Sequence, residues 1–470
     1  MRKLILLYTI IALFLQGCDA VDREQIKHNP VLVSTVKSTA SCVFLTKDNM
    51  GLPAISWIEQ DSLKHKYFYF ANWDTNAGRF GTAIAIPIQP NTSIHEEGMP
   101  KIAFKGDGTI VAIYETSVPS STSKWGLSDI QYTMSFDRGK SWTERKSIQA
   151  DVPLLGSRSF ADIIRLDDGE IAVSWLDTDP INPALGRPVK FARTHTKEGF
   201  GRAVLVDSAA CQCCRTAMST NGQGQVNVVF RDLLPGSIRD ISISVSPDNG
   251  FNFSKPMPFS NDHWVVDGCP HNGPSVVFVG ATKYVSWYTG AKRSGVYYAE
   301  LDANNKTVVK RELSSEARFV QLELMPTGDR IATFDVAYEK GGATFKKIMV
   351  NRINDKGFFE KEISLPLSHA SYPVITALGK DQIVVAWADD NKIYYRLETI
   401  ETINIAVHKE DAAPSTTEKM PLSEAMPSAK DPVCGMMVSA GSEPEQIVNH
   451  GDTIRFCSAA CKRAFLSKAD

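Results

Sequence analysis

A short apolar pattern recurs seven times along the central part of the chain. Each copy consists of alternating or continuous apolar residues, ends in an aromatic residue and usually follows a turn that contains glycine. Successive aromatics lie 57, 61, 55, 57, 47 and 53 residues apart. The aromatics are Trp57, Tyr114, Trp175, Phe230, Trp287, Phe334 and Trp387. Because a period near fifty residues is typical of four-stranded blades, the pattern predicts an all-β propeller with six or seven blades.

The segments around each copy support this prediction. Turns such as Gly106-Asp107-Gly108 precede the copies, and further strands with period-two alternation follow them, most clearly at residues 130–134 and 241–245. The same region contains no apolar pattern that predicts a helix of three turns. We therefore expect an all-β body.

Two of these third strands lead into the same turn motif. The first reads Ser135-Phe136-Asp137-Arg138-Gly139-Lys140-Ser141-Trp142, and the second reads Ser246-Pro247-Asp248-Asn249-Gly250-Phe251-Asn252-Phe253. Both resemble the Asp-box of the sialidase-like propeller superfamily, and the resemblance covers residues 30–400. In this turn the aspartate is expected to accept hydrogen bonds from turn amides, the glycine to take a positive φ and the aromatic to pack between sheets. The motif is structural and does not by itself indicate a chemistry.

The repeat also predicts where a functional site lies. The Asp-boxes and the Asp-Gly turns belong to one end of a propeller, so the starts of the inner strands gather at the other end, around the channel mouth. Counting back sixteen residues from three aromatics gives Cys214, His271 and Arg318, and Arg158 lies seventeen before Trp175. These four residues are expected at the mouth.

Two segments at these positions are rich in metal-binding residue types. Cys211, Cys213 and Cys214 open the fourth blade, and Cys269 and His271 open the fifth. If the first segment is a strand, Cys211 and Cys213 point to one face. Thiolates with an imidazole suit a soft or borderline ion such as Cu(I) or Zn(II). Disulfides between the same cysteines, or a redox role for them, are the open alternatives.

Arginines form a second candidate group at this end. Arg158, Arg215, Arg231 and Arg318 are expected at or near the mouth. Together they form a candidate cationic rim that binds a carboxylate, phosphate or sulfate group of a substrate. Solvation, or pairing with nearby aspartates such as Asp232, is the alternative.

The N-terminal residues predict export. Met1-Arg2-Lys3 and an uncharged apolar run over residues 4–15 have the layout of a secretion signal, and the run is too short to span a bilayer. Leu15-Gln16-Gly17-Cys18 resembles the bacterial lipobox, which implies that Cys18 is lipid-modified; an ordinary signal peptide is the alternative. Asp19 resembles an inner-membrane retention signal. The expected location is a bacterial membrane, facing the periplasm or the cell exterior.

The C-terminal residues predict a second domain. Residues 409–430 are rich in Pro, Ser, Thr and charge, as in a flexible linker. The motif Asp431-Pro432-Val433-Cys434-Gly435-Met436, followed by Phe456-Cys457-Ser458-Ala459-Ala460-Cys461, resembles the YHS/TRASH-type domain. That resemblance implies a small α+β module in which Cys434, Cys457 and Cys461 bind copper or another heavy metal. A disulfide of Cys461 with Cys434 or Cys457 is the alternative.

Charge and cysteine content complete the functional prediction. The formal charge is −2, with 51 basic and 53 acidic residues, so nucleic acid is not an expected partner. Nine cysteines, eight of them beyond Cys18, favour handling of copper or another soft ion, with metal-transport or metal-accepting proteins as partners. A sialidase-type glycoside hydrolase and a non-catalytic surface-binding propeller are the alternatives, and no catalytic residue is assigned. The expected organisation is a signal peptide (1–17), a tether (18–29), a propeller (30–408), a linker (409–430) and a metal-binding module (431–470).

Overall fold

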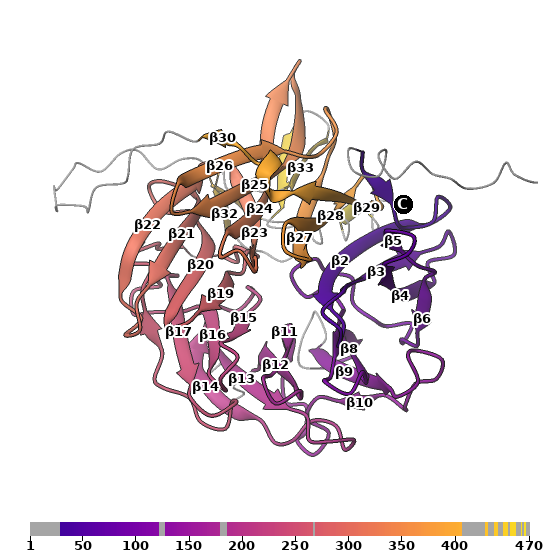
Figure 1. Ribbon diagram of the computed structural model, residues 1–470. Coiled ribbons are helices and arrows are strands. Elements are labelled where there is room, and N and C mark those ends of the chain that lie inside the picture. The colour runs from indigo at the N-terminus through magenta and orange to yellow at the C-terminus, as the bar shows by residue number, and fades with distance from the viewer. Residues whose placement is uncertain are drawn as a thin grey trace, which may run out of the picture.

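Seven antiparallel sheets form a ring around a central axis (Figure 1). The computed structural model describes residues 29–121, 127–178, 186–266 and 268–406, together with residues 428–430, 437–439, 445–449, 452–456, 462 and 465–466. The strand order within each sheet follows the chain, except where β1 closes the ring and where β30 is added to the sixth blade. The all-β propeller prediction is confirmed, and the number of blades is seven.

Each blade has an inner strand beside the axis and a second strand that carries the repeated aromatic. The inner strands are β2 (Thr39–Lys47), β7 (Lys101–Phe104), β11 (Ser159–Arg165), β15 (Ala217–Thr220), β19 (Ser275–Val279), β23 (Ala317–Leu324) and β27 (Ser371–Leu378). The second strands are β3 (Pro53–Gln60), β8 (Ile110–Val118), β12 (Ile171–Leu176), β16 (Val226–Arg231), β20 (Thr282–Thr289), β24 (Arg330–Lys340) and β28 (Gln382–Asp389).

Two further strands complete each blade toward the outside. The third strands are β4 (Lys66–Asp74), β9 (Leu127–Ser135), β13 (Arg187–Arg193), β17 (Ile241–Ser246), β21 (Gly295–Leu301), β25 (Ala343–Asn354) and β29 (Lys392–Thr399). The outer strands are β5 (Arg79–Phe80) and β6 (Ile84–Ile86) in the first blade, then β10 (Lys146–Ser147), β14 (Val204–Ala210), β18 (Met257–Pro258), β22 (Thr307–Ser314) and β26 (Gly357–Glu362), with β30 (Ile405–Ala406) added to β26.

The ring is closed by the first strand of the chain. Strand β1 (Val31–Leu32) is the outer strand of the seventh blade, where it pairs antiparallel with β29. Within the described ranges of the propeller, the helical structure is one 3₁₀ turn at Ile400–Thr402. The last blade is therefore made from both ends of the propeller sequence.

The core lies between neighbouring blades and depends on the repeated aromatics. Each of the seven is at most 2% exposed. Trp175 of the third blade packs with Ile113 and Ile130 of the second, and Trp287 of the fifth packs with Val229 of the fourth. Each aromatic thus removes a large apolar surface from water at a junction, which explains why one aromatic recurs per blade.

Both Asp-boxes adopt the expected turn. Gly139 has φ 87°, and its amide donates to Ser135 Oγ at 2.7 Å. Asp137 Oδ1 accepts from the Ser141 amide at 2.8 Å. The closing aromatic, Trp142, meets Phe70 of the first blade edge to face, with ring centroids 6.2 Å apart. The turn therefore joins two neighbouring blades.

Hydrogen bonds place the Asp-box at the same end as the Asp-Gly turns. The amide of Asn249 in the second box donates to the carbonyl of Gly224, between β15 and β16, at 2.7 Å. The Gly224 amide donates in turn to Asp167, in the corresponding turn of the preceding blade, at 2.7 Å. The starts of the inner strands therefore lie at the opposite end, which is the channel mouth.

The expected lipid anchor and most of the expected C-terminal module lie outside the described residues. These include Cys18, Cys434, Cys457 and Cys461, so their roles stay predictions. In the described part of the C-terminal region, β31 (Ser428–Lys430), at the end of the expected linker, pairs with β32 (Met437–Ser439) of the module, and β33 (Glu445–Asn449) pairs with β34 (Asp452–Phe456). Residues 462, 465 and 466 are helical. No helix in the described ranges has the length and apolar character needed to span a bilayer.

Candidate metal centre at the mouth of the propeller

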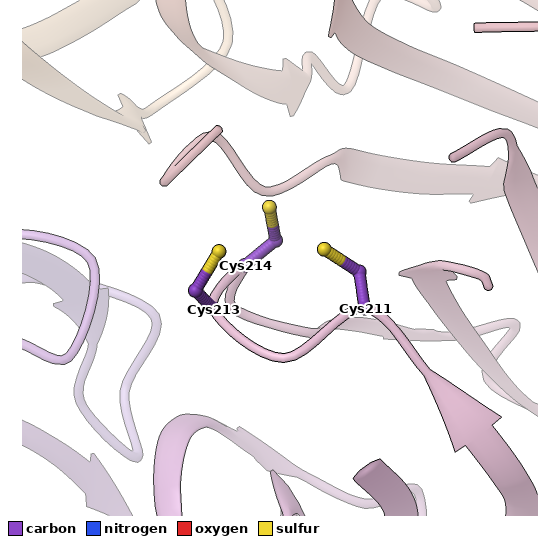
Figure 2. A group of neighbouring side chains, drawn as sticks. All are labelled: Cys211, Cys213 and Cys214. Carbon is purple, nitrogen blue, oxygen red and sulfur yellow. The ribbon is translucent and has the colours of Figure 1, made fainter. Parts of the chain in front are cut away.

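Cys211, Cys213 and Cys214 lie in the turn that connects β14 of the third blade to β15 of the fourth. They are not in a strand, so the prediction that strand alternation brings Cys211 and Cys213 to one face is wrong. The chain reverses here, and the Cys211 amide donates to the Arg231 carbonyl at 2.9 Å. Figure 2 shows that all three thiols rise from the same side of this turn.

Five sulfur and nitrogen donors converge above this turn. The Sγ atoms of Cys211, Cys213 and Cys214 lie within 4.8 Å of one another. The Sγ atoms of Cys213 and Cys269 and a ring nitrogen of His271 form a second such group, again within 4.8 Å. All four cysteines are free thiols, and the three in the turn are at most 4% exposed. The donors that open the fourth and fifth blades therefore lie close together at the channel mouth.

The segment that carries His271 is fixed by buried charged side chains. Arg215 donates to the carbonyl of Pro274 at 2.7 Å, and Arg231 donates to the carbonyl of Asn272 at 3.0 Å. Glu97, from the connection between the first two blades, accepts from the Gly273 amide at 2.7 Å. These contacts satisfy backbone groups that no strand pairs, and they hold His271 in place before any ligand binds.

His271 also has an uncommon backbone conformation. Its φ is 46°, in the left-handed region that side chains with a Cβ rarely adopt. Residues with the same property stand at the start of inner strands in four other blades, usually at a β-bulge, namely Cys42, Phe160, Phe319 and Tyr372. A bulge redirects a side chain, and strained backbone of this kind is concentrated at functional sites.

A second histidine, which the sequence analysis did not single out, lies beside the first. The rings of His95 and His271 are 5.0 Å apart, and Phe160 meets both rings edge to face. His95 Nδ1 accepts from the Glu97 amide at 3.1 Å, so the proton of the neutral ring is on Nε2. His95 is therefore a hydrogen-bond donor beside His271. Gly98, three residues after His95, lies sixteen residues before Tyr114. The spacing that located Cys214 and His271 could therefore also have indicated the segment of His95.

The thiols differ in acidity because they interact with one another and with arginines. Hydrogen bonds from the thiols of Cys213 and Cys214, with Arg239 and Arg231 nearby, hold the pKa of Cys211 well below its usual range. Burial raises the pKa values of Cys213 and Cys214. Burial alone disfavours the charge on Arg239, yet the negative charge of Cys211 leaves the pKa of Arg239 raised. Of the three thiols in the turn, Cys211 is thus the one whose thiolate form its surroundings favour.

Arg187, also missed by the sequence analysis, supplies a further positive charge. Burial lowers its pKa to about 10, while Glu115 and Asp177, followed by the thiols of Cys213 and Cys269, favour its charged form. Its guanidinium donates to the Gln212 carbonyl, inside the cysteine turn, at 3.2 Å. Arg187 therefore stays charged near neutral pH and holds the turn.

The predicted arginine rim does not form as an open anion site. Arg158 is 3% exposed, pairs with Asp129 at 3.2 Å and donates from Nη2 to the Val152 carbonyl at 3.0 Å. Arg215 and Arg231 are 4% and 1% exposed and bind carbonyls between blades. Arg318, by contrast, lines a cavity. The prediction of a shared clamp is corrected because unpaired carbonyls, buried between blades, take up the guanidinium donors.

The cavity beside Arg318 lies between the fifth, sixth and seventh blades. It has a volume of about 620 Å³, and its lining includes Tyr288, Arg318, Asp335, Lys346 and His369. Arg318 stacks over the Tyr288 ring at 4.8 Å. Burial raises the pKa of Asp335. This hollow has no cysteine in its lining. It presents the cations Arg318, Lys346 and Lys462 together with the carboxyl groups of Glu316, Asp335 and Glu339.

Comparison with known proteins defines the class of the molecule. No protein-family profile matches the sequence, and no curated protein matches it. Among solved structures the chain is similar to the BP39L lectin from Burkholderia pseudomallei, with a TM-score of 0.52, 12% identity and coverage of 79% of this chain and 97% of the lectin. It is also similar to the polysaccharide lyase Uly1, with a TM-score of 0.50, 10% identity and coverage of 82% and 94%.

A third similar structure is an intramolecular trans-sialidase from Ruminococcus gnavus, with a TM-score of 0.49, 9% identity and coverage of 81% of this chain and 99% of the enzyme. At such identities the likeness shows the fold alone. The protein has a seven-bladed β-propeller fold, as the strand order of its sheets also shows. Because this fold carries many unrelated activities, the chemistry has to be argued from the mouth.

Proposed function

We propose that this protein binds and handles a soft metal ion, with copper as the expected ion, outside the cytoplasm. The observation that carries the proposal is the meeting of Cys211, Cys213, Cys214, Cys269 and His271 at one end of the propeller. Buried free thiols with an imidazole form a donor set that selects Cu(I) or Zn(II) over hard cations. Nearby arginines offset the negative charge that thiolate ligands bring.

Rigid surroundings support binding at this site. The turn and the His271 segment are held by Arg187, Arg215, Arg231 and Glu97. Binding an ion therefore requires little ordering of the chain, which favours affinity. In the proposed mechanism the C-terminal module, with Cys434, Cys457 and Cys461 as ligands, exchanges the ion with the propeller. The linker keeps the two sites at high effective concentration.

Metal content tests the proposal. The protein is purified under anaerobic, reducing conditions with Cys434, Cys457 and Cys461 replaced by Ser, so that any bound ion belongs to the propeller. We expect stoichiometric copper or zinc by mass spectrometry and reduced thiols in a thiol titration. Cys213→Ser combined with Cys269→Ser should abolish binding.

Cys42→Ala is the matched control, because Cys42 is a buried cysteine in no disulfide and packs in a separate apolar cluster. This variant should retain the metal. A reduced wild-type propeller that binds neither copper nor zinc would overturn the proposal, and far-UV circular dichroism shows whether each variant keeps the β fold.

We propose that the mature protein is held at a bacterial membrane by lipid on Cys18. In the part of the chain that the structure describes, no helix is long and apolar enough to cross a bilayer, and lipid on Cys18 would supply the hydrophobic anchor. Cys18→Ser should therefore move the protein from the membrane fraction to the soluble fraction after a carbonate wash. Retention of the variant in the membrane fraction would refute the anchor.

Binding of an acidic sugar is a second candidate function, and the cavity beside Arg318 favours it. Arg318 and Lys346 offer cationic donors, and Tyr288 offers an aromatic surface. Calorimetric titration with sialylated and uronic-acid oligosaccharides tests this candidate. Binding that is lost in Arg318→Ala but kept in Cys213→Ser would support it, and the absence of any heat of binding would reject it.

A further inference from the structure

Cys213 belongs to both groups of donors at the mouth. It lies within 4.8 Å of Cys211 and Cys214 in one group and within 4.8 Å of Cys269 and His271 in the other. Its thiol also interacts with the thiols of all three other cysteines. Cys213 is thus the donor that joins the two groups.

The distances separate the donors into two sets of three. Donors of one ion cannot be farther apart than twice the metal–ligand bond, which for a Zn–S bond of about 2.3 Å means about 4.6 Å. Each set of three meets this condition within a few tenths of an ångström, whereas the five donors together do not form one such group. A single ion therefore reaches one set or the other without a rearrangement of the chain.

We propose that the mouth holds two Cu(I) ions, one in each set, bridged by the Cys213 thiolate. The first ion has Cys211, Cys213 and Cys214 as ligands, and the second has Cys213, Cys269 and His271. This inference rests on the proposed function and specifies the form of its site.

Coordination number favours copper over zinc in this arrangement. Structural zinc sites almost always have four protein ligands, and each set offers three. Thiolate-rich sets of this kind select Cu(I). Conversion of the cysteines to ligands releases their protons, because the thiolate is the metal-binding form.

The charge of the filled site is also compatible with its surroundings. Four thiolates and two Cu(I) ions leave two negative charges. Cys213 and Cys269 interact with the charge of Arg187, and all three of Cys211, Cys213 and Cys269 interact with that of Arg239. Arg231 lies close to Cys211 and Cys214. These guanidinium groups offset the excess charge in a buried place, where it would otherwise be costly.

Stoichiometry of Cu(I) binding tests the inference. The full-length chain with Cys434, Cys457 and Cys461 changed to Ser is titrated anaerobically with Cu(I) against a chromophoric Cu(I) chelator. We expect two ions per chain and a copper–copper scattering contribution in X-ray absorption spectra. Both results are needed, because two separate sites would also bind two ions.

Single substitutions identify the bridge. Cys214→Ser removes a ligand of the first ion only, and His271→Ala removes a ligand of the second ion only. Each should lower the stoichiometry from two to one. Cys213→Ser should lower the affinity for both ions and abolish the copper–copper scattering contribution. Cys42→Ala should leave the stoichiometry and the scattering unchanged.

The outcomes separate this inference from the proposed function. One Cu(I) per wild-type chain would overturn the dinuclear centre and leave the proposed function intact. Two ions without copper–copper scattering, with Cys213→Ser losing only one of them, would overturn the bridge. No bound copper or zinc in the reduced protein would overturn both.

Discussion

Arg215 and Arg231 stabilise the fold at the propeller mouth by donating hydrogen bonds to buried carbonyls. Their side chains are buried, and their donors reach carbonyls of Gly273, Pro274 and Asn272 in the next blade. These carbonyls belong to a connection between blades, where no strand pairs them. A guanidinium has five N–H donors, so one arginine can bond several buried carbonyls. Each of these carbonyls would lower the free energy of unfolding if it were buried without a hydrogen bond.

Glu115 is the residue for which the structure predicts a measurable pH effect. It is buried, its carboxylate accepts from the Phe160 amide at 2.6 Å, and burial raises its pKa to about 7 from 4.5. The folded state therefore binds its proton more tightly than the unfolded state. Its contribution to stability is complete below pH 4.5 and is lost as the pH rises to 7 and above, at a cost of roughly 3 kcal/mol.

The variant Glu115→Gln should remove this pH dependence, because a neutral amide oxygen still accepts from Phe160. Urea denaturation at pH 5 and pH 8 is the measurement. We expect the variant to be more stable than the wild type at pH 8 and to differ little at pH 5. An equal loss of stability in both proteins between these pH values would contradict the assignment.

At the scale of the element, the sequence predicted the strands better than the connections. The aromatics of the second strands repeat because every blade junction needs one, so their spacing alone locates seven strands. The turn that holds Cys211 has no such repeat. Its shape depends on Arg187 and Arg231, which are distant in sequence, so strand alternation gave the wrong local structure although the convergence with His271 was foreseen.

The Asp-box offers a sharp test of this packing. Gly250 has φ 88°, and a Cβ placed on it would lie 2.1 Å from Phe191 Cε1. Gly250→Ala should therefore lower the free energy of unfolding by about 3 kcal/mol, through both backbone strain and overpacking. Chemical denaturation measures the loss.

Gly222→Ala is the matched control for this variant. Gly222 has φ 78°, and no atom lies within 4 Å of the added Cβ. This change introduces backbone strain alone, at about 1 kcal/mol. Equal losses for the two variants would show that contact with Phe191 does not matter.

At the scale of the whole molecule, the ring depends on strand β1. Val31 and Leu32 pair with Tyr395 and Tyr394, and Val31 and Val33 pack against the apolar cluster between the first and seventh blades. Without β1, strand β29 presents an unpaired edge. The sequence could not indicate this closure, because two residues are too few to form a recognisable pattern.

A chain that begins at Ser34 lacks this strand. Calorimetry should show a melting temperature lowered by a few degrees relative to a chain that begins at residue 29, and light scattering should show self-association through the free edge. An unchanged melting temperature with a monomeric chain would refute the role assigned to β1.

The closure by β1 has a further consequence for the order of events during folding. Val31 meets Tyr395, which is 364 residues further along the chain, so the ring stays open until the last blade has been made. Contacts of such long range form late and slowly. The blades that carry the thiols of Cys211, Cys213, Cys214 and Cys269 precede the last blade in the sequence, so we expect these thiols to meet while the ring is still open. In an oxidising compartment, arrival of a metal ion would then compete in time with disulfide formation.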